Sequence, residues 1–203
     1  MSEHNIHAGH EHPAGLQDMD GPPAAGFPST SLSRVLDKIL IIIGSWASWL
    51  WLAVVAVILT SVISRYAFGA GSIAMEELGW HISSFVWLLG MAYTLVYDQH
   101  VRVDVFHERL SPRTQGWIEL FGIVFLLLPF LGVVVYYAST WSWGSFVLSE
   151  RSQAPSGLPY RWFLKFVMTA SMVLIAVGAL SRLLKVTALL FGFPKPRGAD
   201  KLP

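Results

Sequence analysis

The ionisable residues of this chain gather at the ends of long apolar segments. Glu76 and Glu77 open one such segment, and Arg65 lies shortly before them. Carboxylates at the mouth of an apolar helix could pass a proton or a cation, because ionisable groups in membrane segments often mark ion paths. They could also pair with Arg65 or with a partner subunit. We favour this structural pairing, since an interfacial ion pair needs no transport role.

Two further polar groups lie at segment ends. The run His100-Val-Arg102-Val-Asp104 follows the segment that Glu76 begins, and residues 106–110 after it could lie along the membrane surface. The other group precedes the last apolar segment and comprises Glu150, Arg151, Arg161 and Trp162. We expect each charged group to be solvated, to pair locally or to contact a partner. Arg102 and Asp104 could also pair with lipid headgroups.

Catalytic and cofactor chemistry has little support in the sequence. A haem would need two histidines at one depth on different helices, whereas His81 and His100 lie toward opposite ends of one segment. The absence of cysteine excludes disulfides and thiolate chemistry. Four histidines near the start could chelate a transition metal, but a solvated tail explains them equally well; they are His4, His7, His10 and His12. We therefore predict no enzyme activity, no cofactor and no metal site.

Composition identifies the class of protein that must position these residues. Hydrophobic residues make up 54% of the 203 positions and charged residues only 13%, which is typical of an integral membrane protein. The net charge of +1, without a basic cluster, argues against a nucleic-acid partner.

Four apolar runs are long enough to cross a bilayer, which takes roughly 20 helical residues. They cover residues 39–63, 78–97, 117–137 and 163–184. We predict an all-α integral membrane protein with four transmembrane helices and short interfacial helical segments. Residues 1–33 are expected to form a disordered tail, 34–192 the transmembrane domain and 193–203 a polar C-terminal tail.

Some positions within these runs allow finer predictions. Pro129 should kink the third helix unless neighbouring groups compensate. Arg182 and Lys185 are expected to extend toward the interface. Small residues should allow close helix contacts; they are Gly44 and Ser48 in the first run and Gly79, Ser83, Gly90 and Thr94 in the second.

Basic residues predict the orientation. With four spans, both termini and the middle loop share one side, which holds ten of the fourteen Lys and Arg residues. The opposite side holds Arg65, Arg151, Arg161 and Lys165. Since cytoplasmic loops carry the excess of positive charge, both termini are expected in the cytoplasm.

Over residues 34–190 the sequence resembles the small membrane subunit of tripartite ATP-independent periplasmic (TRAP) transporters, the DctQ-like small permease. The resemblance rests on the order of four motifs: Arg65-Tyr66-Ala-Phe68-Gly69, Glu76-Glu77-Leu78, His100-Val-Arg102-Val-Asp104, and Glu150 followed by Trp162. Residues 149–162 look like those of the mannitol/chloroaromatic or keto-acid subgroup. The chain departs from the family at Ala74-Met75, where a Trp is frequent, and at Thr169, where a Pro is frequent.

The resemblance implies a multi-pass subunit of the bacterial inner membrane. A larger permease would hold the sodium and substrate sites, and a periplasmic substrate-binding protein would deliver the substrate, expected to be an organic acid. The small subunit would brace the large permease as a static scaffold and help to dock the binding protein. The alternative is a stand-alone four-helix membrane protein, either a redox anchor or a small carrier.

Overall fold

The computed structural model describes residues 27–97 and 110–194. Over these ranges the chain is helical and contains no β-strand, which confirms the all-α prediction. The elements are α1 (Ser31–Ser48), α2 (Leu50–Phe68), α3 (Ile73–Val96), α5 (Pro112–Phe121), the π-helix η1 (Gly122–Leu127), α6 (Leu128–Val147) and α7 (Arg161–Phe191). Most of both predicted tails lies outside the described residues.

The first apolar run forms two consecutive helices, α1 and α2, separated by Trp49 alone. Thr30 and Ser33 form a reciprocal capping box that starts α1 well before the apolar run. At Trp49 the backbone tightens, and the N–H of Leu52 donates to the carbonyl of Trp49 at 3.1 Å. Gly69 ends α2 in the left-handed conformation with φ of 65°, which glycine adopts without steric cost.

The proline of the third apolar run is accommodated by a π-helix. Pro129 lacks an N–H group, and in a regular helix its ring would clash with the carbonyl four residues earlier. The π-helix ends directly before α6, where the Leu128 N–H donates to the carbonyl of Ile123. This wider turn is the compensation that the sequence left open, since π-turns insert one residue into the helical ladder.

All helices extend beyond the apolar runs that predict them. Helix α7 has 31 residues and continues past Arg182 to Phe191. Helix α6 includes Trp141 and Trp143, which lie beyond the third apolar run at residues 117–137. Both differences have one cause, because helices continue past the hydrocarbon region as long as their ends find hydrogen-bond partners.

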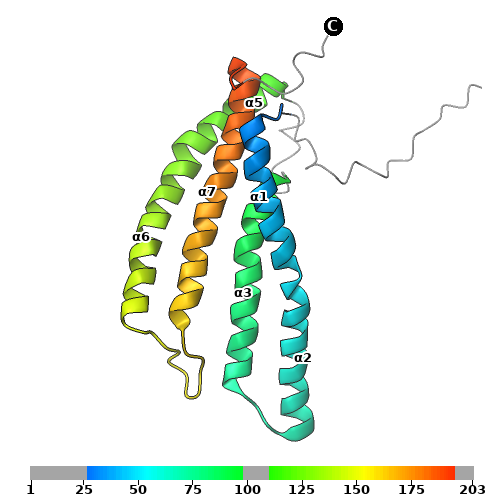
Figure 1. Cartoon of the computed structure of the whole chain (residues 1–203), viewed down its shortest axis with the longest axis vertical. Coiled ribbons are helices and arrows are strands. Elements are labelled where there is room, and N and C mark those ends of the chain that lie inside the picture. Colours follow the sequence, from blue (N-terminus) through cyan, green and yellow to red (C-terminus); the bar gives the residue numbers. More distant parts are fainter. Residues whose placement is uncertain (1–26, 98–109, 195–203) are drawn as a thin grey trace, which may run out of the picture.

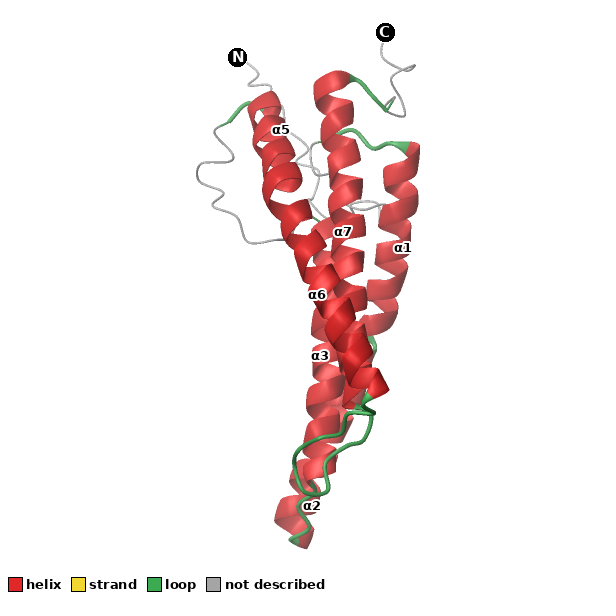
Figure 2. Ribbon diagram, turned by 90° about the vertical axis from the view of Figure 1, so that its left-hand side faces the viewer, coloured by secondary structure: helices red, strands yellow, loops and turns green. Residues whose placement is uncertain are grey.

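The helices lie side by side in the order α6, α7, α3, α2 in the lower half of Figure 1. Seen from the side, this half is narrow (Figure 2). At the other end α1 packs on both α3 and α7, and α5 packs on α7. The α2–α3 turn and the loop of residues 148–160 share the lower end, which we call the loop end.

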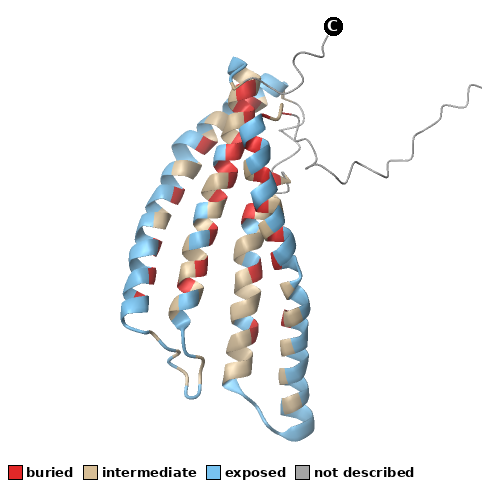
Figure 3. Ribbon diagram, in the orientation of Figure 1, coloured by how far each residue is buried: buried red, intermediate tan, exposed pale blue. Residues whose placement is uncertain are grey.

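The buried core lies away from the loop end, where the helices converge (Figure 3). Its buried residues come from α1, α3, α6 and α7 and are Leu40, Ala92, Val96, Leu131 and Ile175. Many large apolar side chains face outward, including Trp46 at 75% exposure. Outward apolar surface of this extent suits a bilayer or a membrane partner.

Within the described ranges, three helical rods are long and apolar enough to cross a membrane: Ser31–Phe68, Pro112–Val147 and Arg161–Phe191. Helix α3 is not among them. Its 24 residues extend about 36 Å, which is sufficient length, but its first turns carry Glu76, Glu77 and His81. The structure therefore establishes several apolar helices, three of the rods with spanning length and composition and α3 with spanning length alone.

Small residues allow close approach at some of the predicted positions. A Cβ on Gly44 would lie 2.3 Å from a ring carbon of Tyr93, so the Tyr93 side chain of α3 packs directly on the α1 backbone there. Gly79 faces Val57 and Ile58 of α2. Gly90 has open space around it. The small-residue face of α3 is thus used partly within the subunit.

Candidate functional site

The polar contacts of the chain form two groups, one at the loop end and one at the opposite end. At the loop end, Glu77 of α3 connects the helix to the loop of residues 148–160. Its carboxylate accepts hydrogen bonds from the Leu158 N–H at 2.6 Å and from the Ser152 hydroxyl. These contacts join segments about 80 positions apart and fix the loop against the first turns of α3.

Arg65 and Glu76 form an ion pair between α2 and α3. Their side chains are 50% and 36% exposed, so water and salt screen the pair. The pair borders a cavity of about 380 Å³ between the two helices. The Glu76 carboxylate and the Arg65 guanidinium meet here, as the structural interpretation of the acidic pair expects.

Glu150 is the centre of a second set of contacts at the loop end. One of its carboxylate oxygens accepts hydrogen bonds from the Lys165 ammonium and the Ser145 hydroxyl. The Lys165 ammonium, together with Ser145, holds the pKa of the Glu150 carboxyl below its ordinary value of 4.5. The ammonium also lies 3.9 Å from the ring centroid of Trp141, a cation–π contact. These contacts bind α6, the loop and α7 together.

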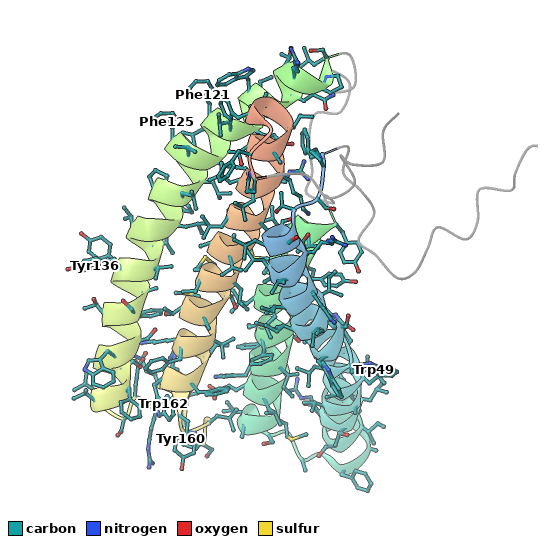
Figure 4. The ribbon with its side chains drawn as sticks, turned by 45° about the horizontal axis from the view of Figure 1, so that its top comes forward. Trp49, Phe121, Phe125, Tyr136, Tyr160 and Trp162 are labelled. Atoms are coloured by element: carbon teal, nitrogen blue, oxygen red, sulfur yellow. The ribbon has the colours of Figure 1, made fainter. Side chains whose placement is uncertain are left out.

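Figure 4 shows Tyr160 and Trp162 at the loop end of α7. Trp162 makes edge-to-face contacts with Phe146 of α6 and with Phe166, at centroid distances of 5.0 and 6.0 Å. It therefore packs α6 against α7. Arg161 is half exposed, and its Nε lies 3.9 Å from Glu150. Arg151 is exposed on the loop. The predicted residues His100, Arg102 and Asp104 lie outside the described residues.

At the opposite end, two buried ion pairs join α7 to its neighbours. Arg182 donates to both carboxylate oxygens of Glu119 at 2.6 and 2.7 Å. Lys185 lies 2.6 Å from Asp37 of α1. Asp37 also accepts a hydrogen bond from the Ser181 hydroxyl at 2.6 Å.

These pairs correct the expectation that Arg182 and Lys185 extend toward the interface, because both side chains turn inward to buried carboxylates. A signal was present in the sequence. Asp37 and Glu119 lie close to the starts of apolar runs, and a basic pair three residues apart on α7 faces one side of its helix. Local spacing does not, however, show which residues meet across helices.

The arrangement holds helices and loops together, and it contains no metal cluster in the part of the chain that the structure describes. Over residues 27–97 and 110–194, no three His, Cys, Asp or Glu side chains lie close enough to hold a metal ion. The carboxylates of Glu76, Glu77 and Glu150 each contact a cation, a hydroxyl or a backbone N–H. Fixed contacts of this kind position structural elements.

Comparison with known proteins identifies the family. Residues 54–189 match the model of the DctQ component of tripartite ATP-independent periplasmic transporters. A TRAP transporter small permease protein of Haemophilus influenzae is 28% identical over 134 residues, covering 64% of this chain and 78% of the relative. No solved structure matches. The chain thus belongs to the DctQ component family of TRAP transporters, and is a multi-pass transport component of the inner membrane and not an enzyme.

Proposed function

We propose that this chain is the small, static subunit of a sodium-coupled TRAP transporter for an organic acid. It braces a large permease and helps a periplasmic substrate-binding protein to dock. The observation that carries this proposal is the engagement of the loop-end carboxylates by internal partners: Glu76 by Arg65, Glu77 by Ser152 and Leu158, and Glu150 by Lys165. Carboxylates that fix loops to helices suit a rigid support better than an ion path.

Four spans with both termini in the cytoplasm form part of this proposal, with α3 as the fourth. Helix α3 lies between α2 and α7 along much of its length, and its acidic first turns contact Arg65 of α2 and the loop of residues 148–160. The ten-to-four distribution of basic residues supports the orientation.

The native chain has no cysteine, so single cysteines report topology without background. In intact spheroplasts, an impermeant maleimide should label Gly71→Cys and Gln153→Cys at the loop end. Thr114→Cys at the opposite end should react only after the membrane is permeabilised. Labelling in the reverse pattern would refute the proposed orientation.

We place the large permease against the outer edge of α1 and α2. Trp46 and Trp49 are 75% and 70% exposed there, and Figure 4 shows Trp49 on the side away from α6 and α7. Trp49 lies 11 residues from Lys38 and 16 from Arg65, about 16 and 24 Å along the helix, which is far from either interface. Tryptophan in membranes prefers the interfaces, because its indole N–H needs a hydrogen-bond partner. A protein partner would supply that acceptor within the bilayer.

Uptake by proteoliposomes tests the proposal. Sodium-driven uptake should need this chain, the large permease and the binding protein together, and this chain alone should transport nothing. Replacing Glu76 and Glu77 by Gln should lower the amount of assembled complex and leave the number of sodium ions per substrate unchanged. A changed sodium number in fully assembled complex would favour direct ion handling, and uptake by the chain alone would favour a small carrier.

A further inference from the structure

Two cavities meet between α3 and α7 at the loop end. The larger has a volume of about 550 Å³ and the smaller about 260 Å³. They share three lining residues, Ser84, Arg161 and Leu164, so they form one continuous recess. None of the roles described above uses this space.

The larger cavity changes from polar to apolar with distance from the loop end. Arg161 and Glu150 line it at the loop, and Trp87, Leu88 and Met168 line it further along the helices. Met168 is two helical turns from Arg161, about 10 Å deeper into the membrane region. A polar mouth over an apolar interior matches a lipid whose headgroup lies at the interface.

The smaller cavity offers a carboxylate and an aromatic ring. Glu77 and Trp80 line it together with Ser152 and Arg161. The hydrogen-bond donors to Glu77 are the uncharged Ser152 hydroxyl and Leu158 N–H. Its negative charge can therefore still attract a cation, and the 69% exposed Trp80 ring can stack against an ammonium group.

Two pairs of opposite charges surround the recess. Lys165 and Glu150 are in direct contact, whereas Arg161 and Glu77 line the recess separately. Lys165 contacts Glu150 directly and balances its charge. Arg161 lies at the limit of an ion pair, 3.9 Å from Glu150, and is half exposed. Arg161 and Glu77 thus present opposite charges to the same recess, and a ligand carrying both an anion and a cation complements them.

We propose that this recess binds a phospholipid with a phosphoethanolamine headgroup. The phosphate pairs with the Arg161 guanidinium, which suits phosphate oxygens in charge and geometry. The ammonium group lies between Glu77 and Trp80, and an acyl chain follows Trp87, Leu88 and Met168. The proposal concerns this chain alone and does not depend on the proposed transport function.

Native mass spectrometry of the purified, delipidated full-length chain tests the proposal. The chain is incubated with phosphatidylethanolamine or phosphatidylglycerol of identical acyl chains, and bound lipid is measured. The wild type should retain phosphatidylethanolamine in preference to phosphatidylglycerol. Arg161→Gln should reduce retention about tenfold, as expected for one lost charged hydrogen bond. Arg151→Gln, which removes an exposed arginine of the same loop, should retain it as the wild type does.

A second variant tests the apolar part without touching a charge. Met168→Trp should fill the larger cavity and lower retention of both lipids, so the test does not depend on the folding of Arg161→Gln. Glu77→Gln should abolish the preference between the two headgroups. Equal retention by Arg161→Gln and wild type, a preference of the wild type for phosphatidylglycerol, or unchanged retention by Met168→Trp would each overturn the proposal.

Discussion

The buried pair of Asp37 and Lys185 allows a sharp test of what holds the helices together. Their side chains are 3% and 11% exposed, so Asp37→Ala leaves an ammonium group in the core without its counter-charge. Breaking a buried pair in this way costs about 3–5 kcal/mol. The Ser181 hydroxyl keeps its contact with the Ser33 carbonyl at 3.1 Å, so it adds little to the loss.

The double variant Asp37→Leu with Lys185→Met removes both charges and keeps apolar volume. Such replacements range from neutral to about 4 kcal/mol stabilising, because the cost of desolvating two charges disappears. Arg65→Gln is the matched control, since the exposed pair with Glu76 contributes at most about 1 kcal/mol. Reversible unfolding by SDS in mixed micelles, followed by circular dichroism, measures all three. A cost below about 1 kcal/mol for Asp37→Ala, or an equal cost for the double variant, would refute the reasoning.

Three further predictions concern packing, pH and docking. Gly44→Val should destabilise the chain by about 1–3 kcal/mol, because its Cβ would lie 2.3 Å from the Tyr93 ring, whereas Gly90→Ala, in open space, should be neutral or stabilising in the same unfolding assay. The lowered pKa of Glu150 means that its contribution to stability is complete above the unfolded value of 4.5 and is lost as pH falls through the folded value. The wild type should therefore lose more thermal stability than Glu150→Gln as the pH falls from neutral to well below the unfolded value, and parallel melting curves would contradict this. Arg151→Glu should weaken docking of the binding protein most at low salt, measured by surface plasmon resonance, and unchanged docking would remove this loop from the interface.

The sequence predicted the helical class and the order of the helices because apolar runs of spanning length are a local signal. The ends of the helices were harder to predict from the sequence. The capping box at Thr30 and Ser33 starts α1 eight residues before the predicted run at Ile39, since caps stabilise helical residues outside the hydrocarbon. The sequence predicted that Pro129 would disturb the third helix. The π-helix that accommodates it depends on helix packing, which residue spacing alone does not reveal.

The sequence identified which charged residues are candidates, but it predicted only some of the residues that they contact. Arg65 and Glu76 lie on either side of one short turn, so their pairing follows from local geometry. The contacts of Glu77 with Ser152 and Leu158 cross about 80 positions of sequence and need the folded loop. The contact between Asp37 and Lys185 spans 148 positions, so the sequence shows both charged residues but not that they meet across helices.

Co-purification from native membranes tests the central claim most directly. The tagged chain is extracted in several mild detergents, and co-purifying proteins are identified and quantified by mass spectrometry. The scaffold account predicts a large multi-span permease at near-equal stoichiometry, and Trp46→Ala with Trp49→Ala should reduce its recovery. A folded chain that purifies alone in every detergent would contradict the account and favour a stand-alone membrane protein.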